Sequence, residues 1–355
     1  MTAMTTLLDP PRQRSAASAA VTGATAMGFV GGSVAISAVL AGAPLFTAQS
    51  LRYAVACLLL LGLARLTGRS VTRPRGAEWA WLLGIVGSGM VLFNVALVRG
   101  SEHAEPAVLG VSVASVPVAL AVVGPLMTGR RPEPRVLLAA AVVTAGAGLV
   151  QGLGRSDAVG LGWAVVVLAC EAGFTLLAVP VLTRHGAWGV SVHTTWLAAI
   201  VLGVLGLTAE GPGALGRLDG RELAAVGYLA VGMTAVAFVL WYSAVGRLGT
   251  ARAGLLTGVA PVAAAGVGVA MGGAAPGPLV WLGIAVVAAG LVLGFTARVA
   301  DEPVTPAGEP TSSAPLGVPM VGPALETRGT PCADSAPRRT GRSPACSRRH
   351  GRRSA

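Results

Sequence analysis

The chain is poor in charged side chains. Only 12% of its 355 residues are charged, whereas a soluble domain carries about 25%. Hydrophobic residues make up 54%, and the charges lie between long apolar runs. This composition excludes an ordinary water-soluble domain. Because lipid offers the backbone no hydrogen bonds, the apolar runs must form helices or a closed barrel. The runs are about 20 residues long and do not alternate, which favours helices.

Lysine is absent, and cysteine and histidine are scarce. All 26 basic residues are arginine, and we attribute this to compositional bias of a bacterial genome. The four cysteines form no CxxC pair, which excludes a typical zinc site or disulfide framework. No P-loop occurs, so ATP-driven transport has no support within this chain. The sequence predicts no cofactor and no metal.

Ten apolar runs predict an all-α polytopic membrane protein with ten transmembrane helices. The predicted spans are 24–43, 46–66, 78–98, 105–127, 135–153, 159–182, 190–208, 222–244, 252–272 and 278–298.

The chain repeats itself at an offset of 144 residues. Between 107–149 and 251–293, 20 of 43 positions are identical without a gap. The matches that composition alone explains least are Pro117 with Pro261, Pro132 with Pro276, Pro134 with Pro278 and Met127 with Met271. We therefore predict two five-helix repeats, over 24–153 and 159–298. An odd number of helices inverts the second copy, and inverted repeats are typical of secondary transporters.

The placement of the arginines predicts how the chain is oriented across the membrane. With the N-terminus inside, thirteen arginines fall in inner segments before the C-terminal tail, against four in outer loops. The positive-inside rule then places both termini in the cytoplasm of a bacterium, with the helices in its plasma membrane.

The two ends of the chain are polar. Residues 1–23 form a cytoplasmic segment, and the apolar run after them resembles a signal peptide. We reject cleavage because that run has a counterpart in the second repeat. Residues 299–355 are rich in Pro, Ser, Gly and Arg, and we expect a disordered basic tail. The tail could contact anionic lipid; no nucleic-acid partner is expected.

Three stretches resemble the EamA family of the drug/metabolite transporter (DMT) superfamily. They are SLRYAVACLLLLGL, VASVPVALAVVGPLMTGRRPEPRVLLAAAVVTAGAGLV and GVAPVAAAGVGVAMGGAAPGPLVWLGIAVVAAGLVLGF. The resemblance covers about residues 24–298. It implies transport of amino acids or other small organic solutes, driven by a proton or solute gradient. Family members often carry Gly-Glu after the fourth and ninth helices. Here Gly129 is followed by Arg130 and Gly273 by Ala274, so no role is carried over for that acid.

Two ionisable residues lie inside predicted helices. An ionisable group at the centre of a membrane helix costs about 2.5–3.5 kcal/mol on insertion scales, so each calls for a purpose. From the helical rise of about 1.5 Å per residue, Glu171 lies near the midplane and Arg52 nearer the outer surface. We predict that the two form a charge pair. Glu171 could titrate protons or bind a cation, or serve only as a structural partner. Arg52 could have a structural role or extend toward the outer interface.

Polar and aromatic side chains complete the candidate site. Asn94 could bond a solute or a neighbouring helix. Trp241 and Tyr242 could line a cavity or anchor a helix end at the interface. Gln49, Thr175 and Trp196 are weaker candidates. His193 is expected at the inner interface. Glu102, His103 and Glu105 are expected in a solvated outer loop rather than a metal site.

These patterns predict a secondary transporter, an exporter of a small metabolite or amino-acid-like solute, with proton coupling as one option for its driving force. The alternatives are a membrane enzyme and a non-transporting scaffold that uses the basic tail. An enzyme would need a reactive cluster, and the four histidines have no acidic residue beside them inside the membrane. The sequence leaves the oligomeric state open.

Overall fold

The computed structural model describes residues 11–40, 42–152, 154–272 and 275–296, and this part of the chain is helical without a strand. Within it, nine helical stretches are long and apolar enough to cross a membrane. They are Leu45–Leu66, Glu78–Ser101, Pro106–Met127, Pro134–Gln151, Ala158–Leu176, Val179–Ala209, Gly220–Leu248, Thr250–Ala270 and Pro278–Thr296. The predicted all-helical membrane architecture is confirmed. The predicted tail lies outside the described residues.

Two predicted spans differ from the structure. The helix expected over 24–43 is α1 (Pro11–Gly32), followed by the short α2 (Val34–Ser37) and η1 (Ala38–Leu40). Residues rich in Ser, Thr and Arg form its first turns, so α1 begins earlier than predicted and is less apolar than the nine. The sixth predicted span, 159–182, is divided between α9 (Ala158–Leu176) and the start of α10 (Val179–Ala209), and residues 183–189, expected as a loop, lie within α10. Gly186 kinks α10 with φ of 62°, a value that glycine adopts without strain.

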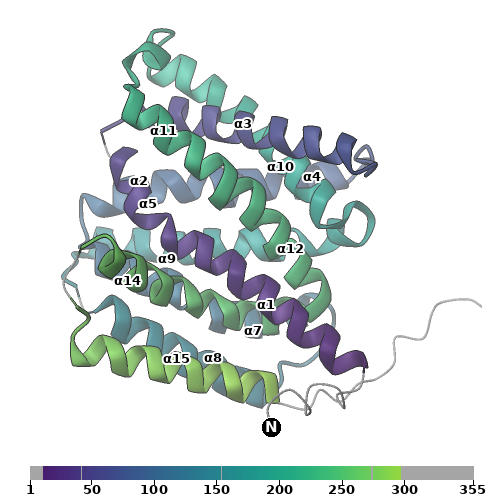
Figure 1. The fold of residues 1–355 in the computed structure, drawn as a ribbon, viewed down its shortest axis with the longest axis vertical. Coiled ribbons are helices and arrows are strands. Elements are labelled where there is room, and N and C mark those ends of the chain that lie inside the picture. The colour runs from purple at the N-terminus through teal and green to yellow at the C-terminus, as the bar shows by residue number, and fades with distance from the viewer. Residues whose placement is uncertain (1–10, 41, 153, 273–274, 297–355) are drawn as a thin grey trace, which may run out of the picture. The chain divides into compact units, whose positions relative to one another are not determined.

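Helices at matching places in the two copies pack against each other. Figure 1 shows α8 (Pro134–Gln151) alongside α15 (Pro278–Thr296). A Cβ added at Gly146 would lie 2.7 Å from the Val287 nitrogen, and one at Gly290 would lie 2.9 Å from the Val143 nitrogen. Numbers that rise along α8 therefore meet falling numbers along α15, so the helices are antiparallel. Glycine permits this close backbone approach, as in many membrane helix pairs.

The same arrangement holds for α3 (Leu45–Leu66) and α10. Ser50 Oγ donates to the Ala199 carbonyl at 2.8 Å. A Cβ added at Gly206 would lie 2.8 Å from Thr47 Oγ1, while one at Gly203 would lie 3.0 Å from Ser50 Oγ. This pair is antiparallel as well. The ends of α3 and α10 are also joined by Glu210, whose carboxylate accepts from the backbone nitrogens of Phe46 and Thr47.

Two helices carry π-helical segments at matching places. The first, η2 (Val86–Leu92), joins α4 (Glu78–Ile85) to α5 (Phe93–Ser101). The second, η4 (Leu229–Val236), joins α11 (Gly220–Tyr228) to α12 (Ala237–Leu248). Their places differ by nearly the repeat offset of the sequence. Segments of π-helix are rare and frequently occur at functional sites, so these two direct attention to the bundle interior around them.

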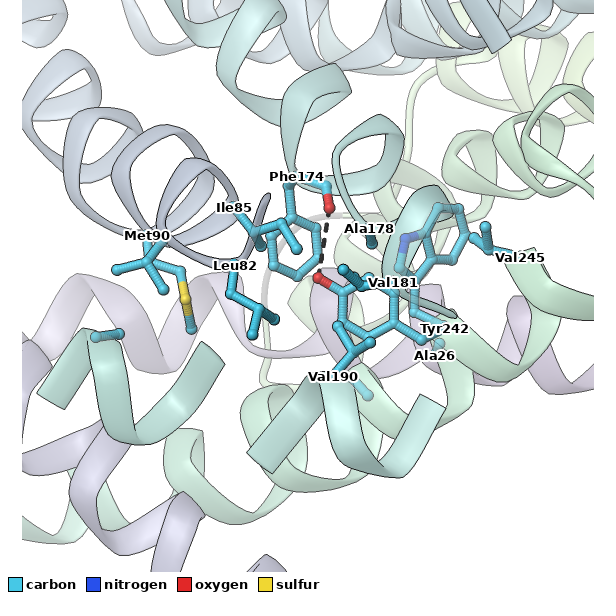
Figure 2. Close-up of a cluster of buried hydrophobic side chains, with 14 of the residues drawn as sticks. Ala26, Leu82, Ile85, Met90, Phe174, Ala178, Val181, Val190, Tyr242 and Val245 are labelled. Carbon is cyan, nitrogen blue, oxygen red and sulfur yellow. Dashed lines mark hydrogen bonds between the residues drawn. The ribbon is translucent and has the colours of Figure 1, made fainter. Parts of the chain in front are cut away.

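The largest buried cluster lies between these π segments and the neighbouring helices. Figure 2 shows Tyr242 at its centre, with Phe174, Leu82 and Val190 around it. Large apolar side chains also face outward, such as Leu58 and Leu207 at 70% and 62% exposed. Outward-facing leucines are what a helix bundle presents to lipid tails. The remaining described elements are α6 (Pro106–Ala114), α7 (Val116–Met127), η3 (Ala214–Arg217), α13 (Thr250–Leu255), η5 (Leu256–Gly258) and α14 (Val259–Ala270).

Candidate functional site

Arg52 is buried in the bundle and bonded to neutral oxygens. It extends from α3, is 5% exposed, and donates from Nε to Thr234 Oγ1 of η4 at 2.7 Å. Its Nη1 donates to Gln49 Oε1 at 3.2 Å, and its guanidinium carbon lies 5.1 Å from the Tyr53 ring centroid. Hydrogen bonds from a charged donor are roughly twice as strong as neutral ones. Arg52 therefore ties α3 to the π segment of the second copy.

The predicted ion pair between Arg52 and Glu171 is absent. Both residues are described, and no oxygen of Glu171 lies within ion-pair distance of Arg52. The rise per residue placed the two at compatible depths, but depth does not fix the direction in which a side chain leaves its helix. Arg52 points at η4, and Gln49 one turn earlier on α3 supplies the second acceptor.

Glu171 is a carboxylate inside the bundle without a partner. It lies on α9, is partly buried, and makes no hydrogen bond or ion pair with the described residues. Across the helices, Tyr242 lies within electrostatic range of it. An unpaired carboxylate in a low-dielectric bundle is costly, and such groups in membrane helices usually serve ion or proton pathways.

Trp241 and Tyr242 meet the same stretch of α9 that carries Glu171. Trp241 Nε1 donates to Thr175 Oγ1 at 3.1 Å, and Tyr242 OH donates to the Phe174 carbonyl at 3.4 Å. Figure 2 shows the second bond as a dashed line between the two aromatic residues. At 3% and 0% exposed, Trp241 and Tyr242 lie inside the bundle. The interfacial-anchor interpretation of these two residues is wrong.

Three aromatic rings pack together beside Glu171. The Phe174 ring centroid lies 5.0 Å from that of Phe238 and 5.2 Å from that of Tyr242. Phe238 and Tyr242 are 6.3 Å apart in a T-shaped arrangement. These distances are typical of attractive aromatic pairs. The rings join α9 to α12. If one helix moves relative to the other, these ring contacts must break; otherwise the two helices move together.

Asn94 bonds within its own helix. Its Nδ2 donates to the Met90 carbonyl at 2.7 Å, inside the π segment η2. The side chain therefore stabilises the irregular backbone there, and the structure shows no bond from Asn94 to a neighbouring helix. The structure does not bring it into contact with Glu171 or Arg52.

A cavity of about 640 Å³ lies at the end of the bundle where α3 and α12 end and α10 begins. Its wall includes Arg69, His185, Trp188, Tyr242 and Arg247. Tyr242 is the most deeply buried of these side chains, so it marks the inner end of the cavity. Tyr242 also bonds to α9 at Phe174, one turn from Glu171, and Glu171 itself is not among the residues that line the cavity.

A hydrogen-bond network that the sequence did not reveal lies beside this cavity. Glu78 accepts from Arg184 Nη1 at 2.5 Å, and His185 Nε2 lies 3.1 Å from the same oxygen. Thr72 Oγ1 lies 3.0 Å from His185 Nδ1. The network fastens the connection between α3 and α4 to the kinked start of α10. The rings of His185 and His193 lie 5.2 Å apart in this network, on the two sides of the kink at Gly186.

His193 belongs to the same network and has a fixed tautomer. Trp196 Nε1 donates to His193 Nδ1 at 3.1 Å, and indole nitrogen can only donate. Nδ1 is therefore unprotonated, and Nε2 carries the hydrogen and donates to the Thr72 carbonyl at 2.8 Å. The ring is neutral in this arrangement. His193 is 7% exposed and lies within the bundle network, which corrects its predicted place at the interface.

At the other end of the bundle, two loops are fastened together. Arg155 Nε donates to Glu105 Oε1 at 2.9 Å, and His103 Nδ1 lies 2.9 Å from Asp157 Oδ2. Asp157 also caps α9 by accepting from the Gly160 nitrogen. This backbone bond, followed by His103, holds the pKa of Asp157 below its usual value. No group of three metal-ligating side chains exists among the described residues.

The comparisons with known proteins agree with this architecture. The model of the EamA-like transporter family matches residues 14–151 and 158–296, two copies that start 144 residues apart. The chain is also similar to a solved crystal structure whose title says no more than that it is of a protein. The match covers 78% of this chain and 97% of the other chain, with 20% sequence identity and a TM-score of 0.65. This likeness concerns the fold alone. No curated protein matches the chain. With both repeats matched by the family model, the chain belongs to the EamA-like transporter family, within the DMT superfamily.

Proposed function

We propose that the protein is a secondary transporter that exports a small amino-acid-like solute by alternating access, coupled to protons through Glu171. Membership in the EamA-like family makes it a multi-pass membrane protein of a transporter family. The observation that carries the proposal is the Glu171 carboxylate on α9, which has no hydrogen-bond or ion-pair partner among the described residues and lies one turn from Phe174, the hydrogen-bond partner of the cavity-lining Tyr242.

The packing of matching helices supports two inverted five-helix repeats. Both α8 with α15 and α3 with α10 are antiparallel pairs, which is the relation that an inverted copy produces. Helix α1 would be the tenth membrane helix. It packs on α12 and α14, while its counterpart α9 packs on α5 and α7. Each copy thus places its first helix against the third and fourth helices of the other copy, and rocking about these contacts can alternate access.

The cavity and the arginines support export as the direction of transport. With both termini in the cytoplasm of a bacterium, the cavity opens to the cytoplasm, because α3 and α12 end on that side. A solute that enters from the cytoplasm meets Tyr242 first and Glu171 beyond it. Proton binding at Glu171 from outside and release inside would supply the energy for export.

Reconstituted flux tests the proposal. The purified chain in proteoliposomes should move at least one member of a broad panel of amino acids and related metabolites faster than empty vesicles do. Removal of residues 300–355 should leave this flux intact, since the tail is not part of either repeat. Flux at the empty-vesicle rate across the whole panel would contradict the proposal.

A further inference from the structure

We propose that His185 and Thr72 form a second proton site of the transporter, on its cytoplasmic side. The imidazole of His185 binds a proton at Nδ1, and the Thr72 hydroxyl exchanges that proton with water. The proposal deepens the proposed function and rests on it, since it names the side chains through which the bundle exchanges protons with the cytoplasm.

The surroundings of His185 connect a buried ring to the surface. His185 belongs to the wall of the cavity, and its side chain is 0% exposed. Its Nδ1 lies 3.0 Å from Oγ1 of Thr72. Thr72 lies in the connection between α3 and α4 and is exposed. The buried imidazole therefore has an exposed hydroxyl as its neighbour, and this hydroxyl links it to water.

The hydrogen bonds of His185 accommodate two protonation states. A carboxylate can only accept, so Nε2, at 3.1 Å from Glu78 Oε2, carries a hydrogen. Nδ1 faces a hydroxyl, which can donate or accept. When Nδ1 is unprotonated, Thr72 donates to it, and when Nδ1 is protonated, the hydroxyl turns and accepts. His185 thus gains a proton without losing a hydrogen bond, and the Glu78 carboxylate lies beside the resulting positive charge.

His193 provides the comparison on the same helix. Its ring centroid lies 5.2 Å from that of His185. Its Nδ1 accepts from Trp196 Nε1, and its Nε2 donates to the Thr72 carbonyl. Because an indole nitrogen cannot accept, a proton on Nδ1 of His193 would break the bond to Trp196. Of these two neighbouring imidazoles, only His185 can take up a proton without losing a bond.

The charged and titratable groups around His185 come from four parts of the chain. They are Glu78 of α4, Arg69 of the connection between α3 and α4, Tyr242 and Arg247 of α12, and Arg184 and His193 of α10 itself. Arginine, glutamate and tyrosine ordinarily titrate outside about pH 5–8, whereas imidazole titrates within it. A change of charge in that range therefore belongs to one of the two imidazoles, and their hydrogen bonds assign it to His185.

The proton step balances with water as the only other reactant. On release, the Nδ1–H bond of His185 breaks and its proton goes to Thr72 Oγ1, while the hydroxyl's own hydrogen passes to water. The imidazole keeps the electron pair and returns to its neutral form, with Nε2–H still on Glu78. Uptake from water follows the same path in reverse.

Nitrogen NMR of the imidazoles tests the proposal without transport. The full-length protein in detergent is labelled with 15N-histidine, and single variants assign the signals because the chain has only four histidines. Between about pH 8 and pH 5, Nδ1 of His185 should gain a proton, while His193 stays neutral with its hydrogen on Nε2. A His185 that stays neutral over this range, or equal protonation of both rings, would overturn the proposal.

Variants of Thr72 assign the exchange to its hydroxyl. Thr72→Val removes the hydroxyl but keeps the backbone carbonyl that His193 uses. It should slow proton exchange at His185 Nδ1, read from the line shapes, at least roughly tenfold, because a positioned proton-transfer group contributes about 10²–10⁴-fold. Thr72→Ser should restore the rate. Thr67→Val is the control, since the exposed Thr67 hydroxyl bonds only to carbonyls of α3. Unchanged exchange in Thr72→Val, or equal slowing in both valine variants, would overturn the proposal.

The two proposals fail separately. Flux of solutes by a protein whose His185 stays neutral would overturn this inference and leave the transporter proposal intact. Protonation of His185 with exchange that depends on Thr72, but without flux of any panel member, would support the proton site and contradict the transporter proposal.

Discussion

The hydroxyl of Thr234 should matter far more to stability than an ordinary buried threonine hydroxyl. Thr234→Val keeps the shape of the side chain but removes the acceptor of Arg52 Nε, in a site where the arginine is 5% exposed. A hydrogen bond to a charged group contributes about 1.5–3 kcal/mol. Neutral pairs between membrane helices average about 0.6 kcal/mol, and charge assistance roughly doubles a bond. We therefore expect Thr234→Val to lower the free energy of unfolding by about 1–3 kcal/mol.

A double-mutant cycle measures the bond itself. Unfolding of the wild type, Thr234→Val, Arg52→Gln and the double variant is followed in detergent by titration with SDS. The coupling free energy between the two positions should reach about 1 kcal/mol. Thr194→Val is the control, because Thr194 is equally buried but bonds only to carbonyls of its own helix. Coupling below about 0.3 kcal/mol, with equal losses in the two threonine variants, would refute the reasoning.

Three further predictions concern packing and the two ends of the bundle. Gly146→Val should lower the free energy of unfolding by about 1–3 kcal/mol through overpacking against α15. Gly148→Val should not, because a Cβ at Gly148 meets open space. Identical unfolding curves for the two variants would contradict this. Glu78→Gln should release the connection between α3 and α4 and speed thiol labelling of a cysteine placed at Ser70, while Glu222→Gln, which only caps α11, should not. The lowered pKa of Asp157 means that its contribution is complete above about pH 3.9 and disappears as pH falls through the lowered value. Exchange of the Gly160 amide hydrogen should therefore accelerate only in that acidic range.

Much of the fold followed from simple periodicities in the sequence. Long apolar runs give the membrane helices, and the 144-residue offset anticipates the two copies that the family model matches. The first helix was placed too late because Arg12 and Arg14 made its first turns look like a polar segment. Residues 183–189 were predicted as a loop, whereas the structure runs α10 through them with a non-helical kink at Gly186.

The site was predicted only in part. Glu171, Trp241 and Tyr242 do lie around one stretch of α9, since polar and aromatic residues in apolar helices tend to face the bundle. The pairing of Glu171 with Arg52 failed because Thr234 of η4 and Gln49 of α3 accept from the guanidinium instead. The rotation that a π segment imposes on a helix cannot be obtained from hydropathy. The network around Glu78 also needed tertiary structure, because it joins residues more than 100 positions apart.

Proton-driven flux through the Glu171→Gln variant tests the central claim most directly. Proteoliposomes are loaded with a transported solute, and its movement is followed with and without an imposed pH gradient. The wild type should accelerate with the gradient, and Glu171→Gln should lose that acceleration, while Glu133→Gln, at a helix start outside the bundle site, should keep it. Wild-type acceleration in the Glu171→Gln variant would contradict the account.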